Sequence, residues 1–99
     1  MRDITRDAIQ AFRNSTRFKR RNTEIKVLRH VTIMLLHGNK IAYKYNDPQN
    51  TIEITNCGWE SNTTKERLNA IQGVSITQKN FVWYLNGKKW DGNLIEIEK

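Results

Sequence analysis

Hydrophobic residues near the start of the chain recur with the spacing of one face of a helix. These positions are Ile4, Ala8, Ile9, Ala11 and Phe12. Asp3 can accept hydrogen bonds from the free N–H groups of a first helical turn. The polar side chains of residues 14–16 compete for backbone hydrogen bonds and disfavour a longer helix. The pattern therefore predicts a first helix that ends near residue 14.

From residue 23 to residue 56, apolar and polar positions alternate with the period of β-strands. The apolar positions of this pattern are Ile25, Val27, Val31, Ile33, Leu35, Ile41, Tyr43, Tyr45, Ile52 and Ile54. Many are β-branched or aromatic, which favours strands. A tight turn is expected at residues 37–40 because Gly38 and Asn39 tolerate positive φ. Pro48, which is the chain's single proline, marks a loop. We expect an antiparallel meander of three or four strands here.

A second helix is predicted over residues 63–72. Thr63 and Glu66 have the spacing of a capping box, in which each side chain bonds a free N–H group near the helix start. Leu68 and Ile71 share one helical face, and Gly73 supplies the stop.

Further strands are predicted at residues 74–78, 81–85, 88–90 and 94–98. Asn86 and Gly87 favour a type I′ hairpin because both central residues of that turn need positive φ. The predicted fold class is α+β, with two short helices and antiparallel β-sheet in the order α-β-β-β-β-α-β-β-β. We expect residues 1–99 to form a single domain, with a basic helix and loop at 1–22 and a sheet with the capped helix at 23–99.

Length and composition restrict the classes of protein. The chain has 99 residues, a length typical of one domain, and 37% of them are hydrophobic. A single cysteine cannot form an internal disulfide or a Cys-rich zinc site. No apolar run approaches the ~18 residues of a membrane span, and the N-terminus lacks a secretory signal. The expectation is a soluble domain of a reducing cytoplasm, without a membrane partner.

Positive charge is concentrated in the first third of the chain. The net charge is +7, and residues 1–29 hold nine Lys and Arg side chains against three acidic ones. A concentrated positive field attracts anionic partners over about a Debye length. Nucleic-acid binding, binding of a protein partner, and simple solubility remain open as explanations.

The candidate nucleic-acid-binding residues lie mostly in this basic segment. They are Arg2, Arg6, Arg13, Arg17, Lys19, Arg20 and Arg21, with Lys88 and Lys89 of the second hairpin as a weaker contact. Arginine suits bidentate phosphate contacts, which carry little sequence information, so DNA and RNA are both possible partners. Phe18, inside the basic loop, either anchors it to the core or stacks on a base.

The strand predicted at residues 81–85 carries large apolar groups on both faces. Phe81, Trp83 and Leu85 alternate with Val82 and Tyr84. Two arrangements remain open. In one, a helix covers each face of the sheet; in the other, one face stays exposed for a partner such as single-stranded bases.

Catalytic chemistry has little support, and we predict no enzyme, no catalytic residue, no metal site and no cofactor. His30 and His37 have no cysteine or carboxylate near them at metal-ligand spacing. His37 and Asp91 fit turns. Cys57 has no neighbouring base and is interpreted as a small buried hydrophobe.

Four sequence blocks resemble a family of small bacteriophage proteins. They are residues 18–23 (FKRRNT), 36–42 (LHGNKIA), 62–71 (NTTKERLNAI) and 83–92 (WYLNGKKWDG). The resemblance implies a phage or prophage gene that acts inside a bacterial cell, and it carries over no activity or functional residue. Two hypotheses follow: a small phage protein that binds nucleic acid, and an inhibitor or adaptor that binds an acidic surface of a host protein.

Overall fold

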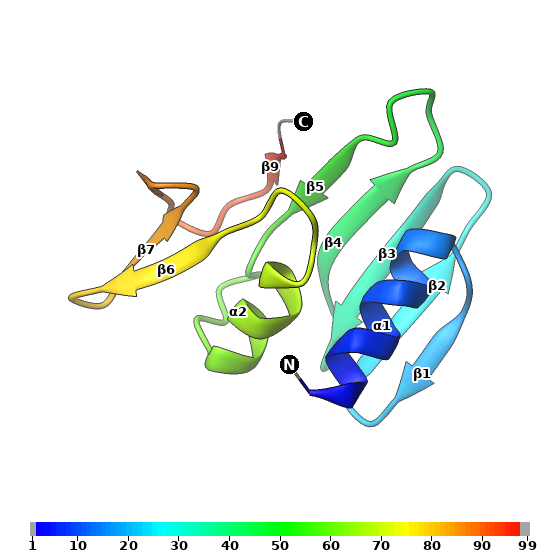
Figure 1. Ribbon diagram of the computed structural model, residues 1–99, viewed down its shortest axis with the longest axis horizontal. Helices are drawn as coiled ribbons and strands as arrows, with labels where there is room; N and C mark the ends of the chain where they lie inside the picture. The colour runs from blue at the N-terminus through cyan, green and yellow to red at the C-terminus, as the bar shows by residue number, and fades with distance from the viewer. Residues whose placement is uncertain (1, 98–99) are drawn as a thin grey trace.

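The computed structural model describes residues 2–97, which form two helices and two antiparallel sheets (Figure 1). The elements are α1 (Asp3–Asn14), β1 (Phe18–Arg20), β2 (Thr23–Val27), β3 (Val31–Leu36), β4 (Asn39–Tyr45), β5 (Ile52–Ile54), α2 (Asn62–Asn69), β6 (Ile76–Lys79), β7 (Val82–Leu85), β8 (Lys88–Lys89) and β9 (Ile95–Glu96). One sheet has the order β1-β2-β3-β4-β5-β9, and the other has the order β6-β7-β8. The predicted α+β class is confirmed, as is the placing of one helix before and one between two runs of antiparallel strands; the runs have five and four strands, where the predicted order has four and three.

One strand lies where the sequence predicted only a basic loop. β1 pairs with β2, with Phe18 opposite Ile25 and Arg20 opposite Thr23. Phe18 packs against the hydrophobic core, and the Arg20 guanidinium lies 5.2 Å from the centroid of its ring. Of the two roles considered for Phe18, anchoring to the core and stacking on a base, the structure shows the anchoring.

Both tight turns lie where they were predicted, but positive φ at the first falls on His37 and Gly38 and not on Asn39, which begins β4. His37 and Gly38 have φ values of 52° and 79°, and Asn86 and Gly87 have values of 51° and 86°. Positive φ at both central residues is what a type I′ turn requires, and this turn matches the twist of the strands that it joins. His37 is thus a turn residue, as expected.

In Figure 1, α1 lies in front of the six-stranded sheet, and α2 lies beside α1, next to β4, and contacts both. The side chain of Arg67 in α2 donates hydrogen bonds both to Thr5 of α1 and to Thr23 of β2. Strand β7 lies in the separate three-stranded sheet. Its Trp83 and Leu85 side chains are buried, whereas Val82 and Tyr84 on the other face are half-buried. On the helix-free face Ile33 is buried between Lys26 and Tyr43, its neighbours in register.

A single hydrophobic cluster joins the helices to both sheets. Phe12 of α1, Leu68 of α2 and Ile25 of β2 meet Trp83 of β7 and Trp90 in this cluster. The two indole rings lie with their centroids 6.2 Å apart. Packing therefore accounts for these two tryptophans, and the small three-stranded sheet is fixed to the larger one through them.

The predicted start and end of the second helix were wrong. Its N-cap is Ser61, whose hydroxyl oxygen accepts a hydrogen bond from the backbone N–H of Thr64 at 3.1 Å. Glu66 takes no part in a capping box because Thr5 and Arg67 engage its carboxylate. The helix ends at Asn69, whose side chain bonds both the N–H and the carbonyl of Ile76 and so turns the chain into β6.

Three smaller expectations also need correction. Asp3 is the first residue of α1 and not its cap; Arg2 holds the cap position without a side-chain hydrogen bond. Phe81 shares no strand face with Trp83, because it sits in the β6–β7 turn with a φ of 65°. The last predicted strand shortens to β9, and its expected end at Glu98 lies outside the described residues.

Candidate nucleic-acid interface

Three of the seven predicted N-terminal cations are engaged within the protein. Arg2 Nε lies 3.3 Å from a Glu66 carboxylate oxygen, and Arg20 Nη1 lies 2.9 Å from one of Asp7. Arg6 pairs with its helix neighbour Asp3 at 3.0 Å. Side chains that already neutralise carboxylates add little positive potential for a partner.

The other four, Arg13, Arg17, Lys19 and Arg21, form no ion pair among the described residues. All four are exposed. Arg13 lies in the last turn of α1, and its carbonyl accepts a hydrogen bond of 2.6 Å from Lys44 Nζ. Arg21 lies at the opposite end of β1, in the turn to β2, with a φ of 53°. The structure thus separates the predicted set into paired and free cations, which the sequence alone could not do.

A hollow lies beside the end of β2, next to the point where the shorter strand β1 begins. Its volume is about 460 Å³, and it is lined by Arg17, Phe18, Lys19, Glu24, Ile25, Lys26, Val27 and Leu28. Three of these residues are free cations, and Glu24 is the one acid that lines the hollow. Lys26 was not among the candidate residues predicted from the sequence. The signal that could have identified it is its exposed position between two inward-facing residues of an alternating strand.

A second hollow of about 270 Å³ lies on the other side of Leu28, with Arg29 and Lys44 among its lining residues. Leu28 is 55% exposed between the two hollows. Burial lowers the pKa of Lys44 from its ordinary value. We name this region the basic end; it consists of Arg13, Arg17, Lys19, Lys26, Arg29 and Lys44. In Figure 1 it lies where the end of α1 approaches the β2–β3 turn.

The predicted hairpin cations do not join the basic end. Lys88 and Lys89 form β8, in the three-stranded sheet, and both are exposed. This sheet and β1 lie on opposite sides of the molecule in Figure 1. One short nucleic-acid segment held at the basic end would therefore leave these two lysines free.

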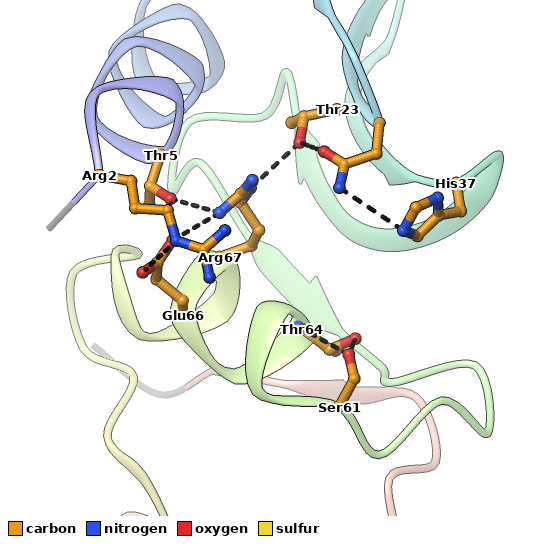
Figure 2. Close-up of polar contacts among 9 residues, drawn as sticks. Arg2, Thr5, Thr23, His37, Ser61, Thr64, Glu66 and Arg67 are labelled. Atoms are coloured by element: carbon orange, nitrogen blue, oxygen red, sulfur yellow. Dashed lines mark hydrogen bonds and ion pairs between the residues drawn. The ribbon is translucent and has the colours of Figure 1, made fainter.

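A buried arginine organises the contact between the helices (Figure 2). The Arg67 side chain is 1% exposed, and its Nη1 lies 2.6 Å from Oε1 of Glu66. Its Nε donates to the Thr23 hydroxyl at 3.0 Å, and its Nη1 also donates to the Thr5 hydroxyl. The hydrogen bond from Thr5, with the charges of Arg2 and Arg67, holds the pKa of Glu66 below its ordinary value. These hydrogen bonds and the ion pair join α1, α2 and β2, so the cluster serves the fold.

The side chains considered for catalysis are not brought together. Cys57 is exposed, which corrects the expectation of a buried thiol, and its Sγ donates to the Lys40 carbonyl at 2.9 Å. Partial burial raises the pKa of this thiol. Asp91 accepts a hydrogen bond from the backbone N–H of Asn93, as turn chemistry predicts. Within residues 2–97 no three His, Cys, Asp or Glu side chains gather where they could hold a metal ion.

One tryptophan differs from the other two. Trp59 is 62% exposed, whereas Trp83 and Trp90 are buried. Its indole lines a pocket of about 320 Å³ between the β3–β4 turn and the start of α2. No function was predicted for Trp59 from the sequence, because nothing in the local pattern distinguishes it from the buried Trp83 and Trp90.

No helix in the described part of the chain has the length and apolar character needed to cross a membrane.

Comparison with known proteins identifies the family of the chain. Neither a curated protein nor a solved structure matches the chain. The family model described as Kyanoviridae Gp96 protein matches residues 1–97. This range includes all four blocks on which the resemblance to phage proteins rested, and the chain therefore belongs to the Kyanoviridae Gp96 protein family of phage proteins.

Proposed function

We propose that this phage protein binds nucleic acid through the basic end, mainly by contacts to phosphate and with little sequence readout. The observation that carries the proposal is the gathering of unpaired cations around two adjoining hollows. Arg17 and Arg29 can each bind one phosphate through two N–H groups, while Lys19 and Lys26 add point charges. DNA and RNA share this backbone chemistry.

The proposed contact set differs from the one expected from the sequence. Arg2, Arg6 and Arg20 contribute less because each already pairs with a carboxylate. If about five cations of the basic end engage duplex DNA, the logarithm of the binding constant falls with the logarithm of salt concentration at a slope of about −4 to −5.

A charge-matched pair of variants tests the proposal. The first combines Arg17→Ala, Lys19→Ala and Lys26→Ala; the second removes three exposed lysines of the small sheet: Lys79, Lys88 and Lys89. We expect the first variant to lose at least tenfold in affinity for random duplex and single-stranded DNA at about 50 mM salt, with a flatter salt slope. The control should bind nearly as the parent does. Equal losses, or no binding by the parent protein, would contradict the proposal.

We propose further that the protein acts by binding, without catalysis, in the cytoplasm of the bacterial host. The support for the first part is the local role of two side chains considered for chemistry: the Cys57 thiol donates to the Lys40 carbonyl, and Asp91 bonds the backbone of its own turn. The support for the second is membership of a phage protein family.

A second candidate function is the inhibition or recruitment of a host protein with an acidic surface. Phe81 favours it, because this ring is 90% exposed at the tip of the β6–β7 hairpin. Exposed aromatic side chains are enriched at protein interfaces. Capture of a host protein from nuclease-treated lysate by the parent, lost in Phe81→Ala, would support this function over nucleic-acid binding.

A further inference from the structure

The pocket beside Trp59 has the size and lining of a site for one planar, polar aromatic group. Its volume of about 320 Å³ exceeds that of a nucleobase. The buried side chains of Leu36 and Ile41 form its apolar part, and the exposed indole of Trp59 forms one wall. An indole offers a large π-face on which any base can stack.

Polar hydrogen-bonding groups complete the lining. They belong to His37, Asn39, Ser61, Thr63 and Thr64. Ser61 and Thr64 are engaged in the cap of α2 (Figure 2), but the side chains of Asn39 and Thr63 make no hydrogen bond within the described residues. The planar amide of Asn39 presents a donor and an acceptor together, as does the edge of a base. No carboxylate lines the pocket, although the neighbouring residue Glu60 is exposed.

The turn that carries Trp59 is ordered by hydrogen bonds of its backbone. The Trp59 N–H donates to the Asn56 carbonyl at 2.8 Å, and the Gly58 N–H donates to the Asn56 side-chain oxygen at 2.8 Å. Asn56 itself is buried, and its N–H bonds the Gly92 carbonyl. An exposed ring held on an ordered turn loses less conformational entropy on binding than one on a mobile loop.

The β1–β2 turn, which carries one cation, is hydrogen-bonded to the pocket residue His37. The His37 N–H donates to the Asn22 carbonyl at 2.7 Å, and their side chains approach to 3.5 Å. Arg21, one of the free cations, directly precedes Asn22. A phosphate of a strand whose base enters the pocket can therefore meet a positive charge at the rim.

We infer that the Trp59 pocket binds an unstacked base of single-stranded nucleic acid. This inference rests on the proposed function and narrows it, because bases inside a duplex are not available to stack on a side chain. Single-stranded nucleic acid is bound at two places: phosphates at the basic end, and one base against Trp59.

Binding of a short single-stranded dT oligonucleotide and of a duplex of equal length tests the inference. Trp59→Ala should weaken binding of the single strand by about 5- to 150-fold, the range for loss of one stacked base, and should change duplex binding little. Trp59→Phe should retain most of the affinity. The salt slope should not change, because no phosphate contact is removed. Phe81→Ala, at the other exposed aromatic residue, is the control and should bind as the parent does.

Intrinsic fluorescence gives a second readout, since Trp59 is the solvent-exposed tryptophan and the other two are buried. Saturation with the oligonucleotide should quench the component of the emission that Trp59→Phe lacks. Equal single-strand affinity in Trp59→Ala and the parent, with the salt slope intact, would overturn this inference and leave the proposed function standing. No binding of any oligonucleotide by the parent would overturn both. The far-UV circular dichroism spectrum of Trp59→Ala should match that of the parent, which is the check that the fold survives.

Discussion

Neutralising Glu66 should destabilise the protein, because it leaves the buried Arg67 guanidinium without its anion. The Arg67 side chain is 1% exposed, so water cannot replace the lost carboxylate. Breaking a buried ion pair by removing one partner costs about 3–5 kcal/mol. Glu66 is itself 27% exposed, so the pair is partly solvated and we expect Glu66→Gln to cost about 2–3 kcal/mol.

Urea unfolding followed by circular dichroism measures this cost. Glu60→Gln is the matched control, because Glu60 is an exposed acid without an ion pair among the described residues, and we expect a change below about 0.5 kcal/mol there. Combining Glu66→Gln with Arg67→Met removes the stranded charge, so the double variant should lose at least about 1 kcal/mol less than the sum of the single variants. Equal costs for the two glutamate substitutions would refute the reasoning.

The same contact makes a prediction for pH. The hydrogen bond from Thr5, with the charges of Arg2 and Arg67, lowers the pKa of Glu66 in the folded protein from its ordinary 4.5. As pH falls, the unfolded chain therefore takes up this proton first. The stabilisation is present above about pH 4.5 and is lost as pH falls through the folded pKa. The difference in stability between the parent and Glu66→Gln should narrow in that acidic range.

Three further predictions concern single residues. Ser61→Ala should cost about 1 kcal/mol in urea unfolding because it removes the cap of α2, whereas Thr63→Ala should be nearly neutral; the reverse result would restore the helix start expected from the sequence. Gly92→Ala should cost more than about 2 kcal/mol, since Gly92 has a φ of 88° and a Cβ there would overlap the Asn56 side chain; a neutral change would contradict this close approach. The hydrogen bond from Tyr45 to a neighbouring carboxylate raises its pKa to about 12. Stability from this bond should therefore be full below pH 10 and fall as pH rises toward about 12, a loss that Tyr45→Phe should not show in alkaline unfolding.

Local signals in the sequence determined the fold class, the type I′ turn at Asn86–Gly87, the place of the other tight turn and most of the strands. A turn such as Asn86–Gly87 is specified by the φ preferences of two adjacent residues, so no distant contact is needed to predict it. Alternation likewise placed Ile25 in the core and Lys26 on the surface. The uneven distribution of charge and the four family blocks were also visible without a structure.

Only the tertiary structure decided which side chains remain free for a partner. Thr63 and Glu66 have capping-box spacing, yet Glu66 turns to Arg67 and to Thr5 of α1, 61 residues away in the chain. Arg17 and Arg20 read alike in the sequence, but folding brings Asp7 to Arg20 and leaves Arg17 beside an open hollow. Burial and ion pairing depend on contacts between distant segments, which local spacing does not encode. For the same reason, the sequence did not show that Trp59 stays exposed beside a pocket while Trp83 and Trp90 are buried.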